Sequence, residues 1–238
     1  MQLNINIKTY VVLLILISAL NACKTTSGKK WIEISQEPLD DNEISEFTII
    51  VKKKNSPKDE VNTYRGTTTM SMSIERIAYV LDDTESKTQW VSRLKQENRL
   101  EGNPFSYRSI AYQHYNLSWP VSDRDYVIES KWSVMKVKKL PTVILSIKSI
   151  IRDDVPEIEG RVRGQLDRLV YKLEKLKSNQ TRVTVEIMVN PKGLLPNFMI
   201  NLIQKEWPIT TLKQLNAQAL KGSAIHEKLK NDLKMVID

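Results

Sequence analysis

The sequence predicts an α+β protein in which a curved antiparallel sheet grips a long helix near the C-terminus. Strand-like segments with alternating and β-branched residues, separated by turn residues, fill the middle of the chain. Apolar residues at helical spacing then run from Pro196 to about Val236. The chain has 238 residues, of which 41% are hydrophobic and 27% charged, and this suffices for one hydrophobic core.

The first part of the fold is predicted to be two strands followed by two helical segments. Residues 46–53 and 61–72 alternate in the manner of strands, and the turn NSPKDE joins them. Ser73 is expected to cap a helix over 74–81, where apolar residues recur at helical spacing. A short helical turn is predicted over 84–90.

A run of strands follows, and the final helix is expected to cover it. The predicted strands are 93–101, 106–117, 126–137, 142–151, 159–176 and 181–190. Tyr126, Ile128 and Trp132 share one face, which must be covered because it is aromatic and aliphatic. Pro208 is expected to bend or break the covering helix.

The N-terminal segment has the features of an export signal with a lipid anchor. Residues 11–20 form an apolar run of ten, which is too short for a spanning helix of about 20 residues and fits a signal peptide. The next residues, LNAC, resemble a bacterial lipobox, in which the cysteine, here Cys23, takes a diacylglycerol group. Cys23 is the only cysteine, which excludes an intramolecular disulfide; the alternative is an ordinary secretory peptide with an incidental cysteine. The predicted organisation is a signal peptide over 1–22, a tether over 23–30 and one domain over 31–238.

The basic composition points to a membrane surface as partner. The formal net charge is +8, and an exported basic protein has little access to nucleic acid, so we expect none as partner. Lys52–Lys54 and the group Lys136, Lys138 and Lys139 could contact anionic lipids, or they are solvated strand ends. We expect an envelope location, bound to a membrane by palmitate-type acyl chains. Lys24 follows the cysteine where inner-membrane proteins of enteric bacteria carry aspartate, which is compatible with the outer membrane.

Four stretches, in order along the chain, resemble the START family of lipid-transfer domains. They are YRG at 64–66, Trp90, WPVSDRDYV at 119–127, and NPKG at 190–193 with LP at 195–196 and WPITTL at 207–212. The resemblance covers about residues 31–220. It implies a helix-grip fold around one cavity that holds a single lipid. We therefore expect a lipid-binding protein, and lipid transfer between membranes is one function that such binding would serve.

The resemblance also implies which lipid to expect. We call the turn within WPVSDRDYV the corner, and its arginine is Arg124. Sterol-transferring members carry an acidic residue on the strand before this corner and a basic residue six places after the corner arginine. Here that position is Ser130, and residues 107–116 contain no carboxylate, so a phospholipid is favoured over a sterol. The corner resembles that of phosphatidylcholine-transfer members, which assigns phosphate binding to Arg124. The alternative is a structural salt bridge of Arg124 with Asp123, Asp125 or Glu129.

Six further residues are candidates for the lipid site. Trp90, Tyr112 and Trp132 are expected to line the cavity, although core packing explains them equally well. Phe198, Met199 and Leu202 are expected to belong to the helix that acts as a lid over the cavity.

Enzyme chemistry is not expected. The two histidines, His114 and His226, lack metal-ligand spacing, and no nucleophile elbow, phosphate-binding loop or dinucleotide motif occurs. We therefore expect a monomer with no metal and no cofactor. Two alternatives are a cyclase or aromatase built on the same fold, and an envelope interaction protein with a filled core.

Overall fold

The computed structural model describes residues 30–40, 46–56, 61–117 and 121–237. Residues 31–238 form one compact unit. The strands are β1 Ile32–Pro38, β2 Thr48–Lys54, β3 Thr63–Met70, β4 Leu94–Glu101, β5 Arg108–Tyr115, β6 Asp123–Val137, β7 Leu140–Ser149, β8 Arg161–Arg163, β9 Gln165–Lys177 and β10 Gln180–Asn190. The helices are α2 Ile74–Asp82, α3 Lys87–Trp90, α4 Asn197–Leu220 and α5 Glu227–Ile237.

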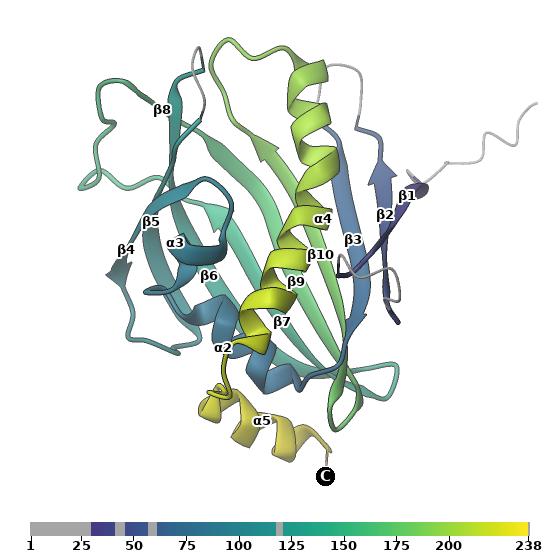
Figure 1. Ribbon diagram of the computed structural model, residues 1–238. Coiled ribbons are helices and arrows are strands. Elements are labelled where there is room, and N and C mark those ends of the chain that lie inside the picture. Colours follow the sequence, from purple (N-terminus) through teal and green to yellow (C-terminus); the bar gives the residue numbers. More distant parts are fainter. Residues whose placement is uncertain (1–29, 41–45, 57–60, 118–120, 238) are drawn as a thin grey trace, which may run out of the picture. The chain divides into compact units, whose positions relative to one another are not determined.

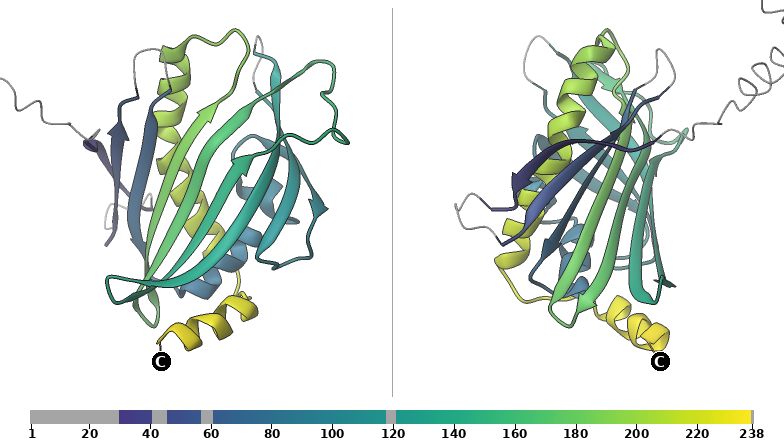
Figure 2. Two further views of the ribbon diagram at one scale, coloured as in Figure 1. Left: turned by 180° about the vertical axis from the view of Figure 1, so that it is seen from behind. Right: turned by 90° about the vertical axis from the view of Figure 1, so that its right-hand side faces the viewer.

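The strands form one curved sheet in the order β1-β2-β3-β10-β9-β7-β6-β5-β4. Neighbours in this order pair antiparallel, and β8 pairs with the start of β6 in parallel. The long helix α4 crosses the concave face, and α2 and α3 lie beside it (Figure 1). Views from behind and from the side show the sheet wrapping around α4 (Figure 2). The predicted α+β helix-grip fold is confirmed.

The core beneath α4 has two parts, which we call the lower core and the upper core after the orientation of Figure 1. In the lower core, α2, the C-terminal half of α4 and α5 pack on the sheet; it includes Ile74, Ile77, Leu145, Leu173, Leu212, Leu215, Leu229 and Leu233. The upper core is smaller and consists of Tyr64, Ala111, Ile128, Leu166 and Ile187, with Trp207 of α4 packed against it. The lower half of α4 is therefore the more firmly embedded half.

Helix α4 passes through Pro208 without a break, so a predicted break there is wrong, whereas a bend at Pro208 stays a prediction. Pro208 is buried and faces β3, where a Cβ atom at Gly66 would lie 2.8 Å from Pro208 Cβ and 2.9 Å from Leu212 Cδ1. Because glycine leaves this space free, helix and strand approach closely. The helix does end before Val236: it stops at Leu220, and α5 is a separate element.

Helix α2 is joined to the C-terminal segment by the side chain of Arg76. Ser73 caps α2 as predicted, because its hydroxyl accepts a hydrogen bond from the Arg76 backbone N–H. The Arg76 guanidinium donates to the carbonyl oxygens of Gln218, Ala219 and Ala224. These carbonyls lie at and just after the end of α4, where the helix leaves acceptors unpaired.

Several element boundaries differ from the sequence-based prediction. Strand β1 was not predicted, because its charged and polar residues hide the alternation typical of a strand. The predicted strand over 159–176 is divided into β8 and β9 at Gly164, where a Cβ atom would lie 2.4 Å from the Tyr126 ring. The charges at 123–125 belong to β6 itself and not to the preceding turn. The signal and lipid-anchor predictions, including Cys23, fall outside the described residues.

Candidate functional site

The three charged residues at the start of β6 have three different partners. Asp123 accepts hydrogen bonds from the His114 ring, with Nε2 and Oδ2 2.7 Å apart, and from the Leu117 backbone N–H. The Leu117 N–H lowers the pKa of Asp123, and the hydrogen bond to His114 adds to this effect. Asp123 therefore fixes the end of β5 at the corner.

Arg124 is buried and holds the loop that leads into α4. Its Nε donates to the Pro191 carbonyl oxygen and its Nη2 to the Lys192 carbonyl oxygen, each at 3.0 Å, and its Nη1 donates to Ser122. The partners are main-chain carbonyls rather than the three carboxylates considered from the sequence. This geometry favours a structural role, and phosphate binding by Arg124 stays a prediction.

Asp125 joins the sheet to β8 on the convex face. Its carboxylate accepts from Arg163 Nε at 2.7 Å and from the Tyr112 hydroxyl at 2.9 Å. The Tyr112 hydroxyl also accepts from Arg161 Nη1 at 2.6 Å, and its ring packs beside Val127. Tyr112 therefore faces away from α4, contrary to its predicted place in a cavity wall. Side chains alternate along β5, and it is Gln113 and Tyr115 that lie on the concave side.

A buried polar network lies on the concave side, between β4, β5 and α3. Lys87 Nζ is 2.7 Å from Glu97 Oε1, and Gln113 Nε2 donates to Glu97 Oε2 at 2.6 Å. The Tyr115 hydroxyl donates to Gln113 Oε1 at 3.2 Å. The Glu97 side chain is 2% exposed and that of Lys87 16%. Nothing in the sequence pattern predicted this network.

Three tyrosines surround this network on the concave face. Tyr115 and Tyr126 meet edge to face, with ring centroids 5.8 Å apart. Burial raises the pKa of Tyr115 well above its usual value, and Glu97, Tyr126 and Tyr171 add to the effect. Burial also raises the pKa of Tyr126 and of Tyr171. These hydroxyls stay protonated, so they can donate hydrogen bonds and present aromatic faces to a ligand.

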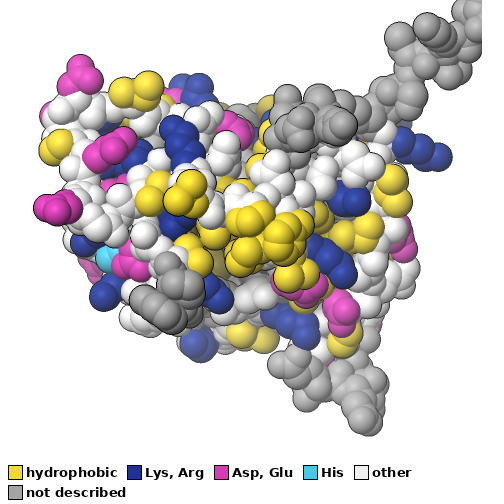
Figure 3. Space-filling view, turned by 90° about the horizontal axis from the view of Figure 1, so that it is seen from above, with side chains coloured by type: hydrophobic (Ala, Val, Ile, Leu, Met, Phe, Trp, Pro, Cys, Tyr) yellow, Lys and Arg dark blue, Asp and Glu magenta, His cyan; other side chains and the backbone are white. Residues whose placement is uncertain are grey.

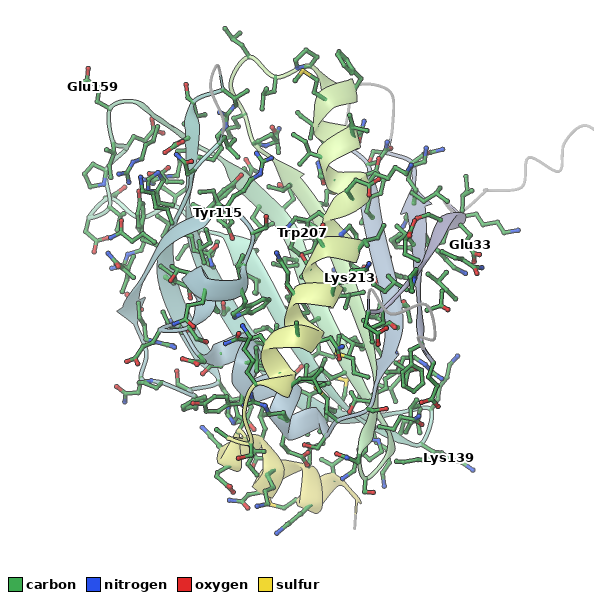
Figure 4. All side chains as sticks on the ribbon, in the orientation of Figure 1. Glu33, Tyr115, Lys139, Glu159, Trp207 and Lys213 are labelled. Carbon is green, nitrogen blue, oxygen red and sulfur yellow. The ribbon has the colours of Figure 1, made fainter. Side chains whose placement is uncertain are left out.

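Two predicted tryptophans lie in the lower core. The Trp132 indole N–H donates to Asp82 Oδ1 at 3.4 Å, so its place is explained by packing. Trp90 follows Lys87 on α3; its indole N–H is buried and has no hydrogen-bond partner among the described residues. Tyr115 on β5 and Trp207 on α4, which packs against the upper core, are labelled in Figure 4. Because its indole N–H has no partner in the part of the chain that the structure describes, Trp90 is a better ligand candidate than Trp132.

The first turns of α4 and the loop before them expose an apolar surface, which we call the apolar end. Phe198 is 71% exposed and Leu202 63%, and Leu194 and Ile203 are exposed beside them. Met199 is half-buried, whereas Ile200 and Gln204 are the residues of these turns that are buried. Hydrophobic side chains gather on the molecule when it is viewed from this end (Figure 3). The predicted lid residues Phe198 and Leu202 thus face outward.

Two hollows within the described part of the chain lie on the convex face. One, of about 290 Å³, is lined by Arg168, Lys172 and Glu186 with neighbours from β7 and β10; the other, of about 150 Å³, lies beside it. Neither lies beneath α4. The described residues contain no group of three or more histidine, cysteine or acidic side chains suited to a metal ion. No helix among the described residues is long and apolar enough to cross a membrane.

Two proteins are similar to this chain in sequence. A mouse phosphatidylcholine transfer protein is 24% identical over 133 residues, which are 56% of this chain and 61% of that protein. An uncharacterized protein of Pseudomonas aeruginosa is 25% identical over 160 residues, 66% of this chain and 75% of that protein.

Solved structures show the same fold. Human STARD10 superposes with a TM-score of 0.70 at 17% identity, covering 91% of this chain and 81% of that one. A STAR-related lipid transfer protein from Xanthomonas axonopodis superposes with a TM-score of 0.64 at 22% identity, covering 80% and 99%. Residues 16–219 match the START domain, so the chain belongs to the START domain family.

Proposed function

We propose that this protein binds one phospholipid between the concave face of the sheet and the N-terminal half of α4. The head group would lie at the network of Lys87, Glu97, Gln113 and Tyr115, and the acyl chains along the upper core. Membership of the START family and the likeness to phosphatidylcholine transfer protein support lipid binding in general. The choice of a phospholipid rests on the network itself.

The observation that carries the proposal is a buried ion pair beside aromatic hydroxyls. Lys87 offers a positive charge to a phosphate, and Glu97 with the faces of Tyr115 and Tyr126 suits a cationic group. Trp90 adds a donor without a partner among the described residues. Glu97 on β4 faces Gln113 on β5, so the sheet supplies a carboxylate that β5 itself lacks. A zwitterionic head group matches this pair of charges better than a sterol hydroxyl does.

Entry is proposed to take place at the apolar end. There the upper core is small, and Gln204 holds α4 to β10 through hydrogen bonds with the Val189 backbone. Separating these contacts opens a path from the exposed Phe198 and Leu202 to the upper core. Burial of acyl chains, at about 25 cal/mol per Å² of apolar surface, offsets the free energy lost when these contacts separate. We propose that the apolar end meets a membrane surface during exchange.

Lipid extraction tests the proposal. Protein purified from its own host is extracted with solvent and analysed by mass spectrometry, and we expect a phospholipid at about one molecule per chain. Transfer of fluorescent phosphatidylcholine between vesicles should be faster with the protein than without it. Absence of both a co-purified lipid and transfer would leave the alternative of an envelope interaction protein with a filled core.

A paired substitution tests the head-group site. K87Q/E97Q removes both charges together, so no single buried charge is left unpaired. We expect transfer to fall about tenfold or more, as when one hydrogen bond to a charged group is lost. K52Q/E33Q alters the exposed pair whose Nζ and Oε2 atoms are 3.5 Å apart and should leave transfer unchanged. Equal loss in both variants would contradict the proposed site.

Anchoring and location form a separate proposal. We propose that Cys23 is acylated and holds the protein at a membrane of the envelope. C23A should move the protein from the membrane fraction to the soluble fraction without altering lipid binding. Recovery of C23A in the membrane fraction to the same extent would contradict an acyl anchor.

A catalytic role remains less favoured than binding. His114 pairs with Asp123 at the end of β5, and His226 lies beneath α2. Within the described part of the chain, the hydrogen-bond and ring contacts of the two histidines do not include Tyr115, Tyr126 or Tyr171. Among the described residues, the partners of the Glu97 carboxylate are Lys87 and Gln113, neither of which is the histidine or second carboxylate that a proton-transfer pair would use.

A further inference from the structure

Three elements bring exposed lysines together at the end of the molecule opposite the apolar end. These elements are the β6–β7 turn, the β9–β10 turn and α5, which lie side by side at the bottom of Figures 1 and 2. We call this surface the basic end and define it by Lys136, Lys138, Lys139, Lys177, Lys228 and Lys234, all of which are exposed. Lys139 is labelled there in Figure 4.

The acidic groups of α5 are already engaged. Glu227 pairs with Lys230, with Oε2 and Nζ 3.3 Å apart, and Asp232 accepts a hydrogen bond from the Tyr107 hydroxyl. Lys138, Lys139 and Lys234 have no ion pair among the residues that the structure describes. Lys138, Lys139 and Lys234 therefore contribute positive charges that are not paired with a described carboxylate.

The β6–β7 turn holds its lysines in an unusual backbone conformation. Lys138 has φ of 49° and Lys139 of 70°, both in the left-handed region that disfavours such side chains. A two-residue turn of this kind is ordinarily built from asparagine and glycine. Residues with strained backbones of this kind cluster at functional sites. The two lysines of the turn are therefore candidates for a functional contact.

We propose that the basic end is a docking surface for an anionic phospholipid bilayer. Clustered lysines suit this partner because each one near an anionic surface strengthens binding about fivefold. Met235, which is 71% exposed beside Lys234, adds the apolar contact that surface-bound helices use. Since α4 is about 36 Å long, the two ends of the molecule can touch two different bilayers. This inference rests on the proposed lipid-binding function, which brings the protein to membranes.

Vesicle sedimentation tests the basic end. The probe is a chain that starts at Lys24, which keeps the whole compact unit and lacks the acylated cysteine. We expect it to sediment with vesicles containing about one third phosphatidylglycerol more strongly than with pure phosphatidylcholine vesicles. About 0.5 M NaCl should remove this difference, because the Debye length then falls to about 4 Å. Equal sedimentation with both kinds of vesicle would overturn the proposal.

The variant K138N/K139G gives the sharpest comparison. It places the favoured residues in the turn, so thermal stability should stay equal or rise, whereas binding to anionic vesicles should weaken about 25-fold. The control K95Q/K148Q removes two exposed lysines from β4 and β7, away from the basic end, and should bind as the unchanged chain does. Equal weakening in the two variants would show a general charge effect and overturn the proposal. Lipid extraction from K138N/K139G should still yield its lipid, which separates this test from that of the proposed function.

Discussion

Arg124 joins the two stretches of sequence that carry the family resemblance. One guanidinium connects the start of β6 with the carbonyls of Pro191 and Lys192. The motif around 119–127 and the NPKG motif are thus two sides of one contact. Sequence alone left two roles open for this residue, because main-chain carbonyls as partners leave no trace in side-chain identities.

Arg124→Leu should destabilise the fold by about 3 kcal/mol, since three main-chain carbonyl oxygens lose the charged donor that holds the loop to β6. Urea denaturation measures the change in free energy of unfolding. Arg161→Leu, on the convex face, is the comparison and should cost less. Unchanged stability of Arg124→Leu together with loss of bound lipid would instead identify Arg124 as a phosphate ligand.

His226 caps α5 from a buried position. Its Nδ1 accepts the Leu229 backbone N–H at 3.2 Å, and its ring lies near Phe105 and Trp132. Burial lowers its pKa below the ordinary 6.5; Lys228 adds to this effect, while Asp82 and Asp232 oppose it.

The protein should lose stability as pH falls below about 6.5, because the unfolded chain then binds a proton that the folded chain resists. His226→Asn keeps a capping acceptor but cannot titrate. Urea midpoints at pH 7 and pH 5 should differ less for the variant than for the natural chain. Parallel changes in both proteins would contradict this origin of the pH dependence.

Among the elements, α4 and β3 approach each other closely at Gly66. Gly66→Ala should cost about 1–3 kcal/mol, because its new Cβ would push against Pro208 and Leu212. Urea denaturation should show the loss, whereas Thr67→Ala on the convex face should change stability by less. A stable Gly66→Ala protein would mean that α4 shifts at little cost.

The order of elements was predictable, but several of their ends were not. Strand-like sequence located β2 to β7 and β10, whereas β8 and β9 were predicted as one strand. Alternation failed for β1, in which only Ile32 and Ile34 alternate with polar residues before Gln36 ends the pattern. The candidate site was harder still. Glu97, Gln113 and Tyr115 come together through strand register, and register is decided by side chains throughout the sheet. Trp90, by contrast, was named from the sequence.

At the scale of the whole molecule, α5 is part of the core although it lies beyond residues 16–219, which match the family. Leu229 is 0% exposed, so Leu229→Ala should cost about 2–5 kcal/mol. Leu220 is 69% exposed, and Leu220→Ala should change the free energy of unfolding by less than about 0.5 kcal/mol. Similar costs in the two variants would show that α5 is dispensable to the core.

The two ends of α4 are held unequally, so a small rotation at the firmly held end displaces the other end. Its C-terminal end is held by the Arg76 guanidinium and by the lower core, which together act as a pivot. Its length of about 36 Å then amplifies small rotations. A tilt of about 5° at the pivot moves the first turn by about 3 Å, so slight repacking beside α2 is felt at Phe198.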